Sequence, residues 1–310
     1  MVLVRYALFA GVLLGMVAGS GPASASFPGR AGKLAFVSDA SGTNDLVIMN
    51  ADGSGRENLT EGPEEDTDPA WSPDGRSIVF VRDGAVYVVR ADGGGVRRLV
   101  VGSAPAWSPD GRRLVFSRLV GRESDLFVMN VNGRGLRRLT RTAGAAESEP
   151  EWSPDGRWIA YSRSARRPLD GGTHVYVMRA NGGGSRRITS GSADGSPAWA
   201  PDSRQLAFIR RDELTDSSQV FVTSLDGRRA HPLVEELQLD PEATFESGPC
   251  WSPDGKRIAF VRGARLYSDL YVASVDGKFL RRMTDNTVAQ VTDQGPTWQR
   301  LAARKRPART

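Results

Sequence analysis

The sequence predicts an all-β fold, a six-bladed β-propeller of four-stranded antiparallel blades, closed by a composite blade from both ends of the chain. Three observations support this: a repeated Trp-Ser-Pro-Asp-Gly motif, regular strand patterns after it, and two incomplete repeats at the chain ends. The motif tryptophans recur at intervals of 36 to 52 residues, at Trp71, Trp107, Trp152, Trp199, Trp251 and Trp298. A repeat of roughly 40–50 residues made of strands and tight turns is typical of propeller blades.

Each repeat begins with a short run that ends in Pro-x-Trp and leads into a tight turn. In this turn proline presets φ and glycine accepts a positive φ, which suits a sharp reversal. We expect the aspartates of the turns to be structural: Asp74, Asp110, Asp155, Asp202 and Asp254. Proline lacks an N–H donor and is restricted to sheet edges, so the strand before each tryptophan should be the innermost, facing the central channel.

Two apolar strands should follow each turn. The second strand of each blade is expected at Ser77–Val81, Arg113–Ser117, Trp158–Ser162, Gln205–Ile209 and Arg257–Val261. The third is expected at Ala85–Arg90, Asp125–Asn130, His174–Arg179, Gln219–Ser224 and Asp269–Ser274. These segments are rich in Val, Tyr and Phe, as half-buried strands require.

A hairpin and a fourth strand complete each repeat. Asp-Gly or Asn-Gly, the strongest short hairpin signal, follows each third strand. Paired arginines then occur at 97–98, 137–138, 186–187 and 281–282. Such charges suit an outer edge strand, because they discourage pairing between the edges of separate molecules.

The two ends of the chain contain complementary parts of one blade. Residues 33–60 have a second, third and fourth strand without a first, whereas residues 294–298 supply only a first strand. Joining them closes the ring and removes its open edges. We therefore expect a propeller over residues 33–299, after a short linker at 26–32 and before a basic tail at 300–310.

The N-terminal region has the features of an export signal. Residues 6–17 form an apolar run that is too short for a bilayer span of about 20 residues. Ala23-Ser24-Ala25 fits a signal-peptidase site. This predicts a signal peptide over residues 1–25 and a periplasmic or extracellular protein, with an uncleaved membrane anchor as the alternative. A single cysteine, Cys250, excludes an internal disulfide.

The formal net charge of +5 comes from the chain ends. Without Arg5 and the five basic residues of 300–310, 35 basic residues remain against 36 acidic ones. A nucleic-acid-binding protein carries positive charge on its folded domain, so we expect no nucleic-acid partner. The basic tail should be disordered and could contact a membrane only peripherally. We expect a monomer.

The repeat Pro-x-Trp-Ser-Pro-Asp-Gly, an aromatic strand, Asn/Asp-Gly and then Arg-Arg-Leu-Thr resembles the TolB-type β-propeller repeat. The resemblance spans about residues 33–298 and implies the propeller alone, without the additional N-terminal α/β domain of that family. Similar blades occur in transport accessories, peptidase partner domains and secreted binding proteins. The resemblance is therefore specific for the fold and does not imply one particular activity.

Motifs for familiar catalytic chemistry are absent from the sequence. It contains no Gly-x-Ser-x-Gly elbow, and its two histidines, His174 and His231, have no cysteine or histidine at a zinc-ligand spacing. We expect no organic cofactor, with Ca²⁺ as the one ion that acidic loops could bind.

Function is expected on the face whose loops vary in length and sequence. Five acidic residues there lie before or within the first strands: Glu65, Asp68, Glu147, Glu149 and Glu246. Around a channel mouth they would attract cations or basic segments, so we expect them to bind a protein or peptide, or an envelope glycan. The alternatives are a carbohydrate-active hydrolase or lyase that uses two of these carboxylates, with or without Ca²⁺, and an ordinary solvated loop surface.

Overall fold

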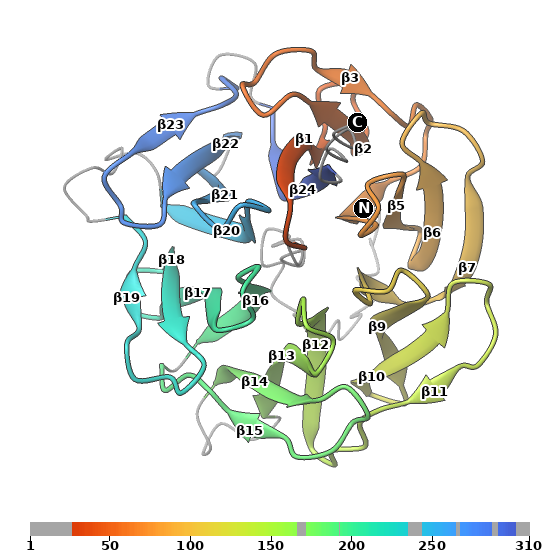
Figure 1. Cartoon of the computed structure of the whole chain (residues 1–310), viewed down its shortest axis with the longest axis vertical. Helices are drawn as coiled ribbons and strands as arrows, with labels where there is room; N and C mark the ends of the chain where they lie inside the picture. The colour runs from red at the N-terminus through yellow and green to blue at the C-terminus, as the bar shows by residue number, and fades with distance from the viewer. Residues whose placement is uncertain are drawn as a thin grey trace, which may run out of the picture.

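The structure, a computed structural model, is a propeller whose six blades surround a central axis (Figure 1). It describes residues 27–165, 172–191, 193–234, 244–264, 267–286 and 291–301. These residues form six four-stranded antiparallel sheets and no helix, which confirms the predicted fold class. Accordingly, this part of the chain contains no helix that could span a membrane. The predicted signal peptide and the tail beyond residue 301 lie outside the described residues.

Blade 1 is composite, as predicted. From the channel outward it contains β24 (Asp293–Leu301), β1 (Arg30–Ser38), β2 (Asp45–Met49) and β3 (Glu57–Asn58). Trp298 lies opposite Leu34, and the pairing continues to Arg30 and Leu301. Both strands run beyond the predicted bounds of 33 and 299, because β24 keeps pairing with β1 where the other inner strands enter a tight turn.

The other blades follow in chain order, each from its innermost strand outward. Blade 2 contains β4 (Asp66–Trp71), β5 (Ser77–Arg82), β6 (Ala85–Arg90) and β7 (Arg97–Val101). Blade 3 contains β8 (Ser103–Trp107), β9 (Arg113–Val120), β10 (Glu123–Asn130) and β11 (Arg137–Arg138). Blade 4 contains β12 (Ala145–Trp152), β13 (Trp158–Ala165), β14 (Thr173–Arg179) and β15 (Arg186–Arg187). Blade 5 contains β16 (Asp194–Trp199), β17 (Gln205–Asp212), β18 (Ser217–Ser224) and β19 (His231–Pro232). Blade 6 contains β20 (Phe245–Trp251), β21 (Arg257–Ala264), β22 (Tyr267–Ser274) and β23 (Leu280–Arg282).

The Ser-Pro-Asp-Gly turns are closed by their own side chains. In blade 2, Ser72 Oγ donates to Asp74 Oδ1 at 2.6 Å, and Arg76 N donates to the same oxygen at 3.1 Å. Gly75 has the positive φ, 70°, that the turn requires. The turn therefore fixes the angle between the innermost strand and the second strand.

The motif tryptophans form the contacts between blades. Trp71 packs with Val37 and Leu46 of blade 1, and Trp152 packs with Leu126 of blade 3. All six have at most 5% of their surface exposed. Since burial of apolar surface contributes about 25 cal/mol/Å², these large rings stabilise each blade against its predecessor.

The paired arginines connect neighbouring blades along the outer rim. The first arginine of each pair donates to a backbone oxygen in the hairpin of the next blade, at 3.0 to 3.2 Å. The four contacts are Arg97 to Val131, Arg137 to Asn181, Arg186 to Leu225 and Arg281 to Asp52. These short outer strands are thus held from the side by a neighbour, in addition to any role as a charged edge.

Candidate functional site

The innermost strands line the channel (Figure 1). Each has a β-bulge close to its tryptophan. The residue three positions before the tryptophan has a left-handed φ of 49° to 55°. These residues are Asp68, Ala104, Glu149, Ser196, Gly248 and Gly295. A residue other than glycine in this conformation costs of the order of 1–3 kcal/mol, and such strain often marks a functional position. Four of the six blades accept this cost on the channel wall.

Two of these bulged residues extend a carboxylate to the next blade. Asp68 Oδ2 accepts a hydrogen bond from Ala104 N at 3.0 Å. Glu149 Oε2 accepts one from Ser196 N at 2.9 Å, and Ser196 Oγ donates to Oε1 at 2.9 Å. Ser162 Oγ also donates to Glu149, at 2.6 Å. Both carboxylates are therefore held in place at blade boundaries along the channel wall.

Asp68 has a perturbed acidity. Burial raises the pKa of Asp68 to about 6; the hydrogen bond from Ala104 opposes this shift, and the charge of Glu149 adds to it. The effect of Glu149 means that carboxylates from blades 2 and 4 interact although blade 3 lies between them. A cation placed between them would stabilise both charges.

Glu147 and Glu246 have a different environment, a buried ion pair. Glu147 Oε1 lies 3.1 Å from Arg163 Nε, and Glu246 Oε1 lies 2.5 Å from Arg262 Nη2. The same contact joins Asp66 to Arg82 and Asp194 to Arg210. In all four blades the acid stands five residues before the tryptophan, and the arginine follows it by sixteen residues.

These ion pairs are also sites of contact between blades. At two of them, the threonine of the Arg-Arg-Leu-Thr segment, or its equivalent, reaches the acid of the next blade. Thr60 Oγ1 donates to Asp66 at 2.6 Å, and Thr140 Oγ1 donates to Glu147 at 3.0 Å. Since these carboxylates are almost fully buried and bonded, they stabilise the ring and offer no free oxygen to a ligand at the channel mouth.

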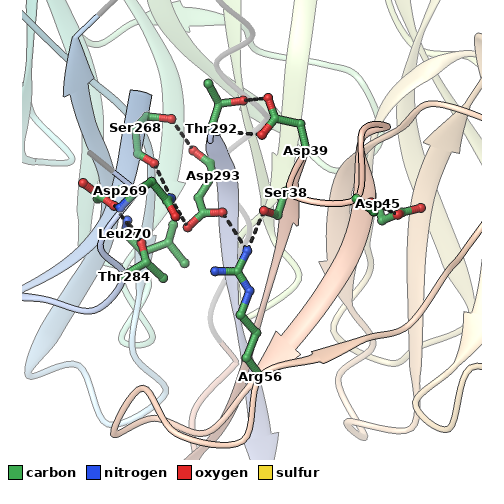
Figure 2. Close-up of polar contacts among 12 residues, drawn as sticks. Ser38, Asp39, Asp45, Arg56, Ser268, Asp269, Leu270, Thr284, Thr292 and Asp293 are labelled. Atoms are coloured by element: carbon green, nitrogen blue, oxygen red, sulfur yellow. Dashed lines mark hydrogen bonds and ion pairs between the residues drawn. The ribbon is translucent and has the colours of Figure 1, made fainter. Parts of the chain in front are cut away.

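Blade 1 forms this contact with a different arginine, because Ser38 stands where the others have the arginine. Arg56 Nη2 lies 3.3 Å from Asp293 Oδ1 and donates to Ser38 Oγ at 2.6 Å (Figure 2). Beside them, Thr292 N and Oγ1 each donate to the carboxylate of Asp39 at 2.7 Å. Burial raises the pKa of Asp293, whereas Arg56 lowers it. This polar network joins β24 to β1 where the ring closes.

Glu65 is exposed on the loop before β4. Its Oε2 accepts hydrogen bonds from Asn44 N at 3.2 Å and Asn44 Nδ2 at 2.6 Å. Of the five predicted acidic residues, Asp68 and Glu149 stand on the bulges of the innermost strands, and the charge of Glu149 adds to the burial that raises the pKa of Asp68.

Three residues that the sequence did not single out also make polar contacts between or along the innermost strands: Glu151, Ser162 and Ser196. Glu151 is fully buried, and its Oε2 accepts a hydrogen bond from Trp199 N at 2.7 Å. Burial raises its pKa well above the usual value, despite that bond. An available signal was its position directly before Trp152, where the other repeats have Ala, Cys or Thr.

Two carboxylates alone do not complete a metal site. Within the described ranges, no group of three or more His, Cys, Asp or Glu side chains could hold a metal ion. Asp68 and Glu149 would supply two oxygen ligands to a Ca²⁺ ion, which takes six to eight, so water and backbone carbonyls would have to provide the rest.

Comparison with known proteins identifies the family. A search of curated proteins finds no match to this sequence. A family model described as the TolB beta propeller domain matches residues 100–301. The chain belongs to the TolB beta-propeller family.

Solved structures resemble this TolB-family propeller in fold. TolB from Acinetobacter baumannii has a TM-score of 0.72 and 22% identity, over 87% of this chain and 67% of that chain. A putative TolB from Agrobacterium tumefaciens has a TM-score of 0.66 and 20% identity, over 82% and 90%. Oligogalacturonate lyase from Vibrio parahaemolyticus has a TM-score of 0.55 and 15% identity, over 86% and 79%. At these identities the likeness concerns the fold alone.

Proposed function

We propose that this TolB-family propeller is an exported binding module that accepts a basic segment of a protein or peptide at the acidic wall of its channel. The observation that carries the proposal is the pair of carboxylates of Asp68 and Glu149, which are held on strained bulges of the innermost strands, where the charge of Glu149 adds to the burial that raises the pKa of Asp68. Export rests on the apolar N-terminal run and the small-residue cleavage site in the sequence.

The physical basis is the electrostatic cost of holding two like charges on the channel wall. Burial is the larger cause of the raised pKa of Asp68, and the charge of Glu149 adds to it, so protonation of Asp68 relieves both costs when no ligand is bound. A lysine or arginine side chain, or a Ca²⁺ ion, would remove the repulsion without protonation. An acidic concave surface also increases the local concentration of cations and speeds the association of basic partners.

A double variant, Asp68→Asn with Glu149→Gln, tests the proposal because it keeps both shapes and most hydrogen bonds while it removes both charges. We expect tetralysine and Ca²⁺ to bind at least about tenfold more weakly by calorimetry, equivalent to about 1.4 kcal/mol. A partner captured from a cell-envelope extract by the wild type should be lost with the variant.

The control variant, Glu57→Gln with Asp92→Asn, removes the same charge from exposed residues of the outer hairpins. It should bind like the wild type. Equal binding of tetralysine, Ca²⁺ and the captured partner by the wild type and the channel variant would contradict the proposal.

A second candidate is a carbohydrate-active hydrolase or lyase. One observation favours it: two interacting carboxylates, one with a pKa of about 6, can act as an acid and a base. Two solved structures of similar fold are oligogalacturonate lyases, one of them in complex with manganese. They are only 15–16% identical to this chain. Incubation with oligogalacturonate, with and without Ca²⁺, and chromatographic detection of shorter products decides this candidate.

A further inference from the structure

Blade 3 differs from its neighbours at the end of the hairpin that joins its second and third strands. In blades 1, 4, 5 and 6, the inner side of this hairpin is covered by an extension of the innermost strand. The residue eight positions after the turn glycine takes part in blades 4 and 6, as do its equivalents in blade 1 and in blade 5, whose turn has Ser203 in place of glycine. The contacts are Asp39 N to Thr292 O, Ser164 opposite Ala146, Arg211 N to Ala193 O and Thr244 N to Gly263 O.

In blade 3 the hairpin is long but its cover is missing. Strand β9 continues to Val120, whereas β8 begins only at Ser103, which lies opposite Ser117. Residues 118–120 therefore pair with β10 on one side and with no strand on the other. By equivalence with Arg211 N and Gly263 O, the N–H and C=O of Leu119 face the open side. Neither group has a hydrogen-bond partner outside the strand ladders among the described residues.

Blade 2 shows that this open edge is specific to blade 3. Its hairpin closes at Asp83 and Gly84, directly after Arg82, so it leaves no residues uncovered. The connection into blade 3 is also the shortest, because only Gly102 separates β7 from β8. The inner strand of blade 3 thus has no chain available to cover the hairpin.

The ion pair of this blade is incomplete as well. Arg118 occupies the position of Arg163, and its guanidinium lies 5.8 Å from the centre of the Phe127 ring. Gly102 stands where the other blades have Asp or Glu, and within the part of the chain that the structure describes Arg118 has no ion-pair partner. The carboxylate of Asp125, on the adjacent strand, is bound by Arg138.

The chain cannot supply the missing acid from position 102. A Cβ atom at Gly102 would lie 2.6 Å from Phe116 Cδ2 and 2.8 Å from Ser117 O, closer than such atoms approach. Around the open edge, three apolar side chains are exposed: Leu119 at 68%, Val101 at 50% and Val120 at 37%. One place on the ring therefore combines an unpaired strand edge, a half-buried arginine without an acid, and exposed apolar side chains.

We propose that this edge binds an extended acidic peptide segment of a partner protein, which adds to β9 as an antiparallel strand. The peptide backbone pairs with Leu119, as added strands do in other proteins, and an Asp or Glu of the peptide pairs with Arg118. The register of blade 4, where Ala145-Ala146-Glu147 lies opposite Ala165-Ser164-Arg163, gives the pattern: two small or apolar residues followed by an acid. The proposal builds on the proposed binding function but uses a surface separate from Asp68 and Glu149.

A peptide of this chain's own sequence is the probe. A capped peptide that copies residues 142–147, Thr-Ala-Gly-Ala-Ala-Glu, stops before the position that Ser103 occupies opposite Ser117. It is titrated into the ¹⁵N-labelled full chain to about 5 mM, a concentration that detects a Kd of about 1 mM, or about −4 kcal/mol. We expect the largest amide shifts at Leu119 and Val120. The same peptide with glutamine in place of glutamate should bind about two- to fivefold more weakly, as expected for the loss of a partly exposed ion pair.

Two variants locate the binding. Leu119→Pro removes the N–H that the peptide needs, and Arg118→Gln removes the charge but keeps a side chain over Phe127. We expect Leu119→Pro to abolish the shifts and Arg118→Gln to make the two peptides bind equally. The second variant keeps the test decisive if the first does not fold.

Three results separate this inference from the proposed function. Shifts at Leu119 that persist in the Asp68→Asn, Glu149→Gln variant support the open edge. Shifts confined to the channel residues overturn it while they leave the proposed function standing. The absence of a shift at Leu119 with either peptide also overturns the inference about the open edge. In that case, the capture of an envelope partner still tests the proposed function independently.

Discussion

Burial, together with the charge of Glu149 on blade 4, raises the pKa of Asp68 on blade 2, so the two carboxylates act on each other along the channel wall. Each is bonded to the following blade, Asp68 to Ala104 and Glu149 to Ser196, and neither can turn away to relieve the repulsion. The pH dependence of stability should report this contact.

We expect Asp68→Asn to stabilise the protein at pH 8 and to have little effect near pH 4. The pKa of Asp68 is about 6 in the folded state and about 3.8 when unfolded, so its favourable contribution is complete below pH 4 and is lost as the pH rises through 6. Asparagine keeps an oxygen for the Ala104 N–H, and the gain at pH 8 should be about 1–2 kcal/mol. Urea unfolding at both pH values measures it.

The control for this prediction is Asp92, an exposed turn residue. The N–H of Gly94 lowers the pKa of Asp92, so Asp92→Asn should not stabilise the protein at pH 8. If the Asp68→Asn variant had the same stability as the wild type at pH 8, the charged carboxylate of Asp68 would not destabilise the folded state.

The buried ion pairs should be among the most sensitive polar positions. Glu246→Ala leaves Arg262, only 2% exposed, without its acid, and also removes the acceptor of Val220 N. Loss of one partner of a buried pair costs about 3–5 kcal/mol. Chemical unfolding should show this loss, whereas Glu65→Ala at the exposed loop should change stability by less than about 0.5 kcal/mol. A small effect at Glu246 would mean that water replaces the carboxylate.

Deletion of residues 293–310 should destabilise the whole ring, because it removes β24 and the buried Trp298 from blade 1. The loss should be several kcal/mol, with one lowered transition in thermal unfolding. Deletion of residues 303–310 alone, which spares β24, should leave the transition unchanged. An unaltered melting temperature in the longer deletion would contradict closure through β24.

His174→Asp should stabilise blade 4. His174 is 5% exposed, and neither ring nitrogen has a hydrogen-bond partner in the described part of the structure. It stands at the register position of Asp125 and Asp269, which bind Arg138 and Arg282. The aspartate should pair with Arg187 in the same way.

The gain from this replacement should be about 1 kcal/mol in chemical unfolding at pH 7. His174→Asn, which has a similar shape without the charge, is the control and should gain less. A destabilised aspartate variant would show that Arg187 does not reach this position.

The fold could be predicted from the sequence because its signals are local and repeated. Trp71 and its five equivalents set the number of blades, and Trp298 without a following Ser-Pro-Asp-Gly turn indicated the composite blade. Each signal depends on the chemistry of a few adjacent residues, such as the fixed φ of proline and the positive φ of glycine.

The candidate site was only partly predictable, as Glu147 and Glu149 illustrate. Two residues apart on a regular strand, they would share one face. The bulge at Glu149 breaks this alternation, so that Glu147 pairs with Arg163 and Glu149 bonds to Ser196. The sequence does not mark the bulge in blade 4 with a glycine. The arginine sixteen residues after each buried acid was an available signal for the ion pairs, but its meaning depends on register.

Because the ring closes within blade 1, we expect that the fold does not require the chain to begin and end in this blade. Arg30 and Leu301 lie opposite each other as the last pair of β1 and β24, so a short linker could join them without disturbing the sheet. New ends could then be opened in a tight turn of another blade, for example after Gly156, which lies between the exposed residues Asp155 and Arg157. Such a circular permutant should keep all six blades while its break moves to blade 4, away from the polar network of Asp293 and Arg56.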